Sequence, residues 1–266
     1  MHILEKIVEK KKEEVAHNKR LYPVALLENS PFFDGPTVSL SKYLLREDKS
    51  GIIAEFKRRS PSKPKINLYA DVEEVTVGYM QAGASALSIL TDNPFFGGSS
   101  NDLIIARKNN FCPILRKDFI IDEYQILEAR SIGADAVLLI CEILSKNQVK
   151  HLAQFALSLG LEVLLELHSE DQLNKICDEV QVIGVNNRNL KIFKTNIDFS
   201  KNLFPKLPKE KVKISESGIH DPGDLLDLQQ IGYQGFLIGE KFMNEAIPGD
   251  ACKYFIQKIH SLKQEV

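Results

Sequence analysis

The 266-residue sequence predicts an α/β fold, a (β/α)8 TIM barrel with an N-terminal helical extension. Three observations predict it: a repeated junction of glycine and apolar run, helix start signals ahead of those junctions, and eight apolar segments of strand length. With 44% hydrophobic residues, a chain of this length can bury the core of such a barrel. We expect one domain over residues 1–266, of which 1–50 form the extension. A doubly wound open sheet is the alternative that strand counting leaves open.

The repeated junction leads from a helix into a strand. It reads QAGASALSIL, SIGADAVLLI, SLGLEVLLEL and QIGYQGFLIG, around Gly83, Gly133, Gly160 and Gly232. Glycine ends a helix readily because it adopts a left-handed backbone at little cost, and the apolar run that follows suits a buried parallel strand. The helices before the junctions have capping residues at Asp71, Asp122, Ser145 and Asp221.

Less regular apolar runs complete a set of eight predicted strands. They cover residues 52–56, 86–90, 113–116, 136–140, 162–167, 182–185, 212–215 and 235–238. Ahead of them, Ile3, Ile7, Val8 and Val15 have the spacing of an amphipathic helix. We expect this helix to cover one end of the barrel; an ordinary surface helix is the alternative.

Composition excludes several classes of function. A net charge of −2 argues against a broad nucleic-acid-binding face, and no apolar run approaches the eighteen residues of a membrane span. Because the N-terminus also lacks the apolar segment of a signal peptide, we expect a cytoplasmic protein. The four cysteines are far apart and the six histidines lack metal-ligand spacing, which predicts neither disulfides nor a metal site. Nothing in the sequence indicates a protein partner.

Charged and polar residues follow several of the predicted strands. Glu55 and Lys57 alternate with Ala54 and Phe56, which places the charged pair on one face of the first strand. The ends of other strands have similar groups: Lys117 and Asp118, Glu166, Asn186 and Arg188, and Glu216. Each alone suits a solvated loop, but parallel barrel strands bring their carboxyl ends to one mouth. Together they predict an active site there.

Two glycine-containing segments predict a phosphate site. SESGI and LIGEKF end the last two strands, with Ser217 and Gly218 in the first and Gly239 and Glu240 in the second. Glycine lets backbone N–H groups approach an anion, and barrels often bind phosphate after strands seven and eight. The expected partner is therefore a small phosphorylated ligand.

These motifs resemble those of the indole-3-glycerol phosphate synthase family. The matching segments are IIAEFKRRSPSK, ALSILTDNPFFGGS, PILRKDFIID, LLELHSE, IGVNNRNL, SESGI and FLIGEKFM, in that order over nearly the whole chain. The resemblance implies closure of 1-(2-carboxyphenylamino)-1-deoxyribulose 5-phosphate (CdRP) to indole glycerol phosphate, with loss of carbon dioxide and water and without metal or cofactor. Phosphoribosylanthranilate isomerase, a related barrel, and a phosphate-binding barrel without catalysis are the alternatives.

The resemblance also implies roles for individual residues. Lys117 is the general acid of ring closure, Glu166 and Glu55 act as acid or base around dehydration, and Lys57 holds the substrate carboxylate or gives a second proton. The implied substrate-binding residues are Ser60, Phe95, Phe96, Asn186, Arg188 and Glu216, with Glu216 orienting a lysine or a substrate hydroxyl. Core packing is the alternative for the two phenylalanines. His168 follows Glu166 by two residues, a spacing that would let it face the site, but we expect it to end the strand at the surface.

Overall fold

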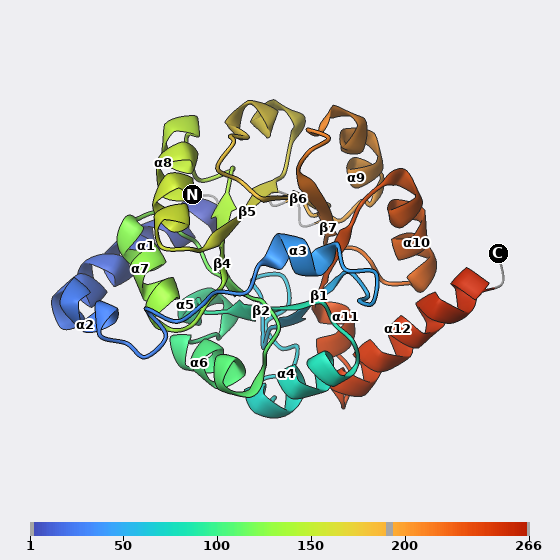
Figure 1. Cartoon of the computed structure of the whole chain (residues 1–266), viewed down its shortest axis with the longest axis horizontal. Helices are drawn as coiled ribbons and strands as arrows, with labels where there is room; N and C mark the ends of the chain where they lie inside the picture. Colours follow the sequence, from blue (N-terminus) through green and yellow to red (C-terminus); the bar gives the residue numbers. More distant parts are fainter. Residues whose placement is uncertain (1–2, 190–193, 265–266) are drawn as a thin grey trace.

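The computed structural model describes residues 3–189 and 194–264; Leu190, the last residue of one motif above, lies outside them. Eight parallel strands form a closed barrel in chain order, and the first strand pairs with both the second and the eighth (Figure 1). This closure confirms the (β/α)8 barrel and rules out the open sheet, whose edge strands would have a single neighbour.

The strands agree closely with those expected from the sequence. They are β1 (Ile52–Phe56), β2 (Ala86–Leu90), β3 (Ile114–Lys117), β4 (Ala136–Ile140), β5 (Glu162–Leu167), β6 (Val182–Asn186), β7 (Val212–Glu216) and β8 (Gly235–Ile238). Three of them reach one residue further at the carboxyl end. Lys117 pairs with Leu90, and Asn186 pairs with Glu216, so these polar residues still belong to the sheet.

Helices surround the barrel. The longer ones are α4 (Val72–Gln81), α6 (Ser100–Asn109), α7 (Glu123–Ser131), α8 (Lys146–Ser158), α10 (Pro222–Ile231) and α12 (Pro248–Gln264). The shorter ones are α5 (Asn93–Phe96), α9 (Asp198–Leu203), α11 (Glu240–Met243) and the 3-10 turns Glu170–Lys175 and Phe204–Lys206. The predicted caps are correct: the side chains of Asp71, Asp122, Ser145 and Asp221 each accept a backbone N–H of the first turn.

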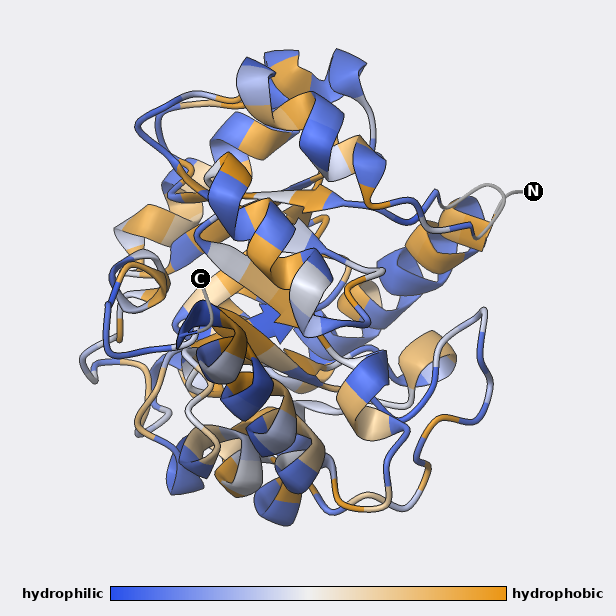
Figure 2. Ribbon diagram, turned by 90° about the vertical axis from the view of Figure 1, so that its right-hand side faces the viewer, coloured by the Kyte–Doolittle hydropathy of each residue, from blue (hydrophilic) through white to orange (hydrophobic). Residues whose placement is uncertain are grey.

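The alternation of side chains along each strand creates two apolar cores. Figure 2 shows the hydrophobic colour gathered on the central strands and mixed colours on the helices around them. One core lies inside the barrel and includes Ile53, Leu115 and Leu164. The other packs the outward residues, such as Ile52 and Val163, against the helices. The inward positions are the ones that can present side chains to a site at the mouth.

The segment before β1 reaches both ends of the barrel. It holds α1 (Ile3–Leu21), α2 (Val24–Glu28) and α3 (Leu40–Leu44). Ile3, Leu4 and Ile7 of α1 line a pocket at the carboxyl ends of the strands. Leu40 and Leu44 of α3 join the interior core from the opposite end, where Figure 1 shows α3 across the front of the barrel. Within the described ranges, no helix has the length and apolarity needed to cross a bilayer.

Candidate active site

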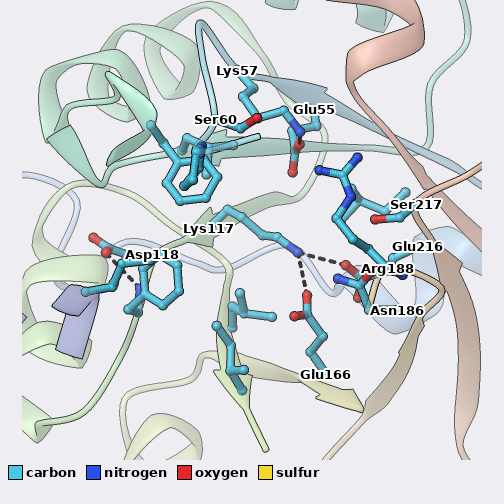
Figure 3. Close-up of a pocket in the computed structure, with 18 of the residues that line it drawn as sticks. Glu55, Lys57, Ser60, Lys117, Asp118, Glu166, Asn186, Arg188, Glu216 and Ser217 are labelled. Atoms are coloured by element: carbon cyan, nitrogen blue, oxygen red, sulfur yellow. Dashed lines mark hydrogen bonds and ion pairs between the residues drawn. The ribbon is translucent and has the colours of Figure 1, made fainter. Parts of the chain in front are cut away.

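The pocket beneath α1 collects the charged ends of four strands. Glu55, Lys117, Glu166 and Glu216 each follow an inward apolar residue by two positions, and therefore point into the barrel. All four line the pocket, together with Lys57, Ser60, Phe96, Asn186, Arg188 and Ser217 (Figure 3). The structure thus brings the predicted catalytic groups together at one mouth.

Lys117 is the centre of this cluster. Its Nζ lies 2.9 Å from Oε2 of Glu166 and 2.7 Å from Oε2 of Glu216, as the dashed lines in Figure 3 mark. The Glu166 and Glu216 side chains are at most 5% exposed. Because buried carboxylates are stable only with partners, the lysine holds both of them and is held by them.

A glycine in β6 makes room for the Glu216 carboxyl group. A Cβ at Gly184 would lie 2.1 Å from Oε1 of Glu216 and 3.1 Å from Cδ1 of Leu164. Any larger residue at this position would displace Glu216 from the barrel interior. The sequence contained this signal, since a glycine inside a strand often marks close approach of another group, but our sequence analysis did not use it.

Burial and charge set the protonation of the cluster. Burial alone lowers the pKa of Lys117, but the surrounding carboxylates outweigh burial and raise it above its ordinary value. Burial raises the pKa of Glu166, yet Lys117 and His168 more than reverse this and hold it well below its usual range. Burial and the neighbouring Glu166 charge raise the pKa of Glu216 to about 8. At neutral pH the site therefore holds a charged lysine, an ionised Glu166 and a largely protonated Glu216.

A second charged pair lies on β1 and the loop after it. Lys57 Nζ donates to Oε1 of Glu55 at 2.6 Å, and the Ser88 hydroxyl donates to Oε2 of Glu55 at 3.3 Å. Burial favours the neutral form of Glu55, but Lys57 and Lys117 reverse this and lower its pKa. The mouth thus has two lysines, each next to an ionised carboxylate.

His168 does not lie at the surface, as the sequence led us to expect. Its side chain is 5% exposed, and Nε2 lies 2.6 Å from Oε1 of Glu166. Because residues two apart on a strand face the same side, His168 shares the inward direction of Glu166, and the backbone at Arg188 covers it. The expectation was wrong because it assumed that the end of this strand is exposed to solvent.

The two polar residues after β6 extend toward the first βα loop. The side-chain oxygen of Asn186 accepts the backbone N–H of Arg188 at 3.0 Å. The Arg188 guanidinium then donates to the Ser62 hydroxyl at 3.1 Å and lies 3.6 Å from Glu240 Oε2. Ser60, also in the first loop, is 3% exposed and lines the pocket.

Of the candidate phosphate-binding and ring-binding residues, some line the pocket and others lie beside it. Ser217 lines the pocket and, like Gly218, has a left-handed backbone, with φ of 66° and 78°. Gly239 lies behind Glu55, since its Cβ would be 2.7 Å from Glu55 Oε1. Phe96 lines the pocket, whereas Phe95 packs against the interior core beside it. Glu240 pairs with Lys63 of the first loop at 3.3 Å.

Comparison with known proteins identifies the family. The family model described as indole-3-glycerol phosphate synthase matches residues 4–254. The chain belongs to the indole-3-glycerol phosphate synthase family. Its function is accordingly that of a carboxy-lyase of tryptophan biosynthesis acting on a small phosphorylated substrate.

Individual relatives agree with this family. The chain is 47% identical over 257 residues to an indole-3-glycerol phosphate synthase of Bacteroides thetaiotaomicron, covering 97% of this chain and 98% of that protein. It is 43% identical over 256 residues to one from Campylobacter jejuni, covering 94% and 98%. A solved structure of thiamine phosphate pyrophosphorylase from Pyrococcus furiosus has a TM-score of 0.60 at 13% identity, covering 83% of this chain and 99% of that one, which shows the fold alone.

Proposed function

We propose that Lys117, Glu166, Glu55 and Lys57 are the catalytic residues with which this member of the indole-3-glycerol phosphate synthase family converts CdRP. The observation that supports this assignment best is the Lys117 ammonium, fixed between Glu166 and Glu216 on the pocket floor. A lysine that is held charged and aimed into a pocket is suited to give a proton to a developing oxyanion.

Ring closure needs one proton at the ribulose carbonyl oxygen. The aromatic carbon that bears the carboxylate attacks the carbonyl carbon, the carbonyl electron pair moves to oxygen, and Lys117 supplies the proton there. Loss of carbon dioxide then returns its bonding electrons to the aromatic ring. Glu216 orients Lys117 during this step, as its 2.7 Å contact with Nζ supports.

Dehydration needs an acid and a base at once. The new hydroxyl leaves as water after it takes a proton, and the methylene carbon next to the ring nitrogen loses a proton as the indole double bond forms. In this proposal Lys57 gives the proton and Glu166 takes one, with Glu55 holding Lys57; the contacts of Lys57 with Glu55 and of Lys117 with Glu166 support these roles. In total the enzyme gives the substrate two protons and takes one from it. The net gain of one proton equals the proton that the overall reaction consumes from solvent when the carboxylate leaves as carbon dioxide.

The remaining pocket residues bind the substrate. Asn186 and Arg188 hold the carboxylate and hydroxyls, for which the forked guanidinium of Arg188 is suited. Ser60 adds a hydroxyl donor from the first loop, and Phe96 forms a wall for the aromatic ring. Phe95 supports this wall from the core side, since it packs against the interior cluster next to Phe96.

The phosphate group binds at the loops after β7 and β8 in this proposal. Ser217 and Gly218 are consecutive residues with left-handed backbone, and such turns point N–H groups toward an anion. Gly239 and Glu240 lie in the adjacent loop, where α11 begins. Lys63 and Arg188, both paired with Glu240, supply positive charge nearby.

One assay tests the activity. Purified protein is mixed with CdRP in the presence of EDTA, and indole fluorescence is followed. We expect turnover without added metal or cofactor, because among the described residues no three histidine, cysteine, aspartate or glutamate side chains gather as metal ligands. Absence of turnover would favour a phosphate-binding barrel without catalysis, and a need for a divalent ion would contradict the proposed acid and base residues. Cytoplasmic localisation is also part of this proposal.

A further inference from the structure

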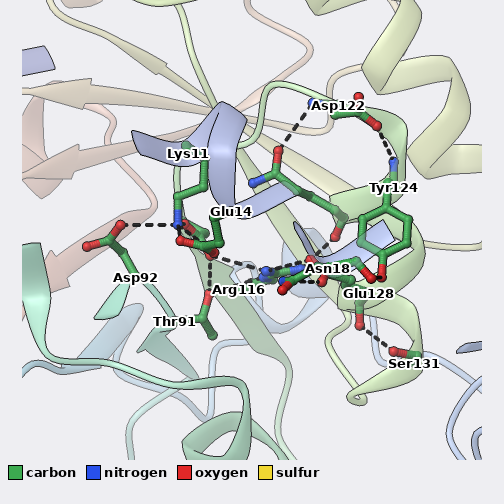
Figure 4. Close-up of polar contacts among 12 residues, drawn as sticks. Lys11, Glu14, Asn18, Thr91, Asp92, Arg116, Asp122, Tyr124, Glu128 and Ser131 are labelled. Carbon is green, nitrogen blue, oxygen red and sulfur yellow. Dashed lines mark hydrogen bonds and ion pairs between the residues drawn. The ribbon is translucent and has the colours of Figure 1, made fainter. Parts of the chain in front are cut away.

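A lysine is buried in the apolar face of α1. Lys11 is 1% exposed and follows Ile7 by four residues, where the amphipathic pattern calls for an apolar side chain. Figure 4 shows the polar contacts of Lys11 with Asp92 and Glu14. The adjacent Lys10 and Lys12 are exposed. A buried ammonium group is stable only when carboxylates surround it, so its partners define its role.

The partners of Lys11 lie in two separate loops of the barrel mouth. Its Nζ lies 3.1 Å from Oδ2 of Asp92, which follows β2, and 3.0 Å from Oδ1 of Asp118, which follows β3. Glu14, one turn further along α1, is 3.0 Å away. One side chain thus joins the helix over the pocket to two catalytic-face loops.

The same two aspartates fix the aromatic wall of the pocket. Oδ1 of Asp92 accepts the backbone N–H of Phe96 at 3.2 Å, and Oδ1 of Asp118 accepts that of Phe119 at 2.8 Å. The Phe96 and Phe119 rings are 5.8 Å apart at their centroids, and both line the pocket with Ile7. Lys11 therefore acts on the backbone that holds both rings.

The pKa shifts of Lys11 and Asp118 favour the charged forms of both groups. Burial raises the pKa of Asp118, but Lys11 and Arg116 outweigh burial and lower it to about 2. Burial lowers the pKa of Lys11, and the carboxylates of Asp118 and Asp92 outweigh this and raise it. Lys11 and Asp118 are therefore both charged at neutral pH, which favours the ion pair between them.

We propose that Lys11 is a positioning residue that fastens the N-terminal half of α1 over the pocket and sets the Phe96–Phe119 wall for the substrate's aromatic ring. This inference rests on the proposed placement of that ring. It assigns to Lys11 no contact with the reacting atoms and no proton transfer.

Lys11→Met tests the proposal, because methionine keeps a long flexible side chain without the charge. The chain offers a matched control in Lys10→Met, since Lys10 is 56% exposed and its ammonium group pairs with the exposed Glu13. We expect Lys11→Met to fold, because the side-chain amide of Asn18 on α1 still donates to Oε1 of Glu128 on α7 at 2.9 Å.

The decisive readout compares two inhibitors, anthranilate for the ring and inorganic phosphate for the other end. We expect Lys11→Met to weaken anthranilate binding by about 2- to 10-fold, the range for a displaced aromatic contact, and to leave phosphate binding within about 2-fold. Hydrogen exchange of the amides in residues 3–11 should become faster. Lys11→Arg should restore much of the anthranilate affinity, since it keeps the charge.

The outcomes separate this inference from the proposed reaction. Anthranilate affinity equal in Lys11→Met and Lys10→Met, or equal loss of both inhibitors, would overturn the inference even if CdRP turnover is normal. If Lys11→Met does not fold, Asp92→Asn takes its place, because the amide oxygen can still cap Phe96 while the charge that Lys11 contacts is removed. An unchanged anthranilate affinity in that variant would also overturn it. Failure of the parent to turn over CdRP concerns the proposed function alone.

Discussion

The imidazole Nε2 of His168 lies 2.6 Å from Oε1 of Glu166, while its Nδ1 lies 3.3 Å from the backbone carbonyl oxygen of Arg188. An ionised carboxylate and a carbonyl oxygen both accept hydrogen bonds, and only a protonated imidazole can donate from both ring nitrogens. Burial lowers the pKa of His168, but the Glu166 charge outweighs burial and raises it. Both contacts therefore favour the imidazolium form of His168, and that form in turn favours ionised Glu166.

His168→Gln should move the pH dependence of activity. Loss of the positive charge destabilises the Glu166 anion, so the pKa of Glu166 rises and the acid limb of kcat/KM shifts to higher pH. His151→Gln is the control, because His151 is 66% exposed and pairs with Glu123 at the surface. An acid limb unchanged by His168→Gln would show that His168 does not influence the base.

The same pair should give a pH-dependent contribution to stability. The folded pKa of His168 is above 6.5, so its contribution is complete below pH 6.5 and is lost as pH rises through the folded pKa. The folded pKa of Glu166 is below 4.5, so its contribution is present above pH 4.5 and is lost as pH falls through the folded pKa. Urea unfolding of parent and His168→Gln should therefore differ most between about pH 4.5 and 6.5. A difference that grows above pH 8 would contradict this.

The fold could be predicted from the sequence because the helix caps and apolar runs each predict the same elements that the barrel contains. Capping residues such as Asp122 and Ser145 act within one helical turn, and apolar runs of strand length leave few alternatives once eight of them alternate with helices. The inward-facing groups of the candidate site could be predicted for a related reason. A two-residue period places Glu166 and Glu216 on the inward face without any knowledge of their partners.

The residues that the sequence analysis missed depend on contacts between distant segments. Lys11 looks like its exposed neighbours in sequence, and its burial results from aspartates more than 80 residues away. His168 was given to solvent because the backbone that covers it comes from the loop after β6. Phe95 and Phe96 belong to a four-residue helix, in which small rotations decide which ring enters the pocket.

Lys117→Ala should remove the proposed general acid. We expect kcat to fall by about 10²- to 10⁴-fold, the usual range for loss of such a group, with a smaller change in KM. Steady-state kinetics with CdRP measure both, and circular dichroism checks folding. Lys108→Ala, an exposed lysine on α6, serves as the control. A folded Lys117→Ala protein with nearly normal kcat would exclude Lys117 as the acid.

Gly184→Ala should displace Glu216. The new Cβ would lie 2.1 Å from Glu216 Oε1, so we expect a loss of stability of about 1 to 3 kcal/mol together with reduced kcat. Gly35→Ala is the control, since its Cβ meets its nearest atom at an ordinary 3.5 Å. Adding Glu216→Asp to Gly184→Ala shortens the side chain that the new Cβ would meet. We expect the double variant to regain stability but not activity. Thermal unfolding that shows no such recovery would exclude the collision as the cause.

The phosphate site needs a test that leaves the glycines unchanged. Valine at Gly239 would push against Glu55, and valine at Gly218 would strain a left-handed backbone and approach Cγ2 of Thr195. Either change would alter the pocket for reasons unrelated to phosphate. A substitution of Glu240 avoids these effects. Its carboxylate pairs with Lys63 and Arg188 and neutralises positive charge that would otherwise attract phosphate.

Glu240→Gln should strengthen phosphate binding if the anion lies at these loops. The substitution removes a repelling charge and releases two cations, and partly exposed pairs of this kind contribute up to about 1 kcal/mol, which corresponds to a gain of up to about 5-fold. Inorganic phosphate is titrated as a competitive inhibitor of CdRP turnover. Glu245→Gln on the same segment is the control, since Glu245 is exposed, whereas Glu240 pairs with Lys63 and Arg188. Phosphate inhibition that is equal in the two variants, or weaker in Glu240→Gln, would move the phosphate away from the loops after β7 and β8.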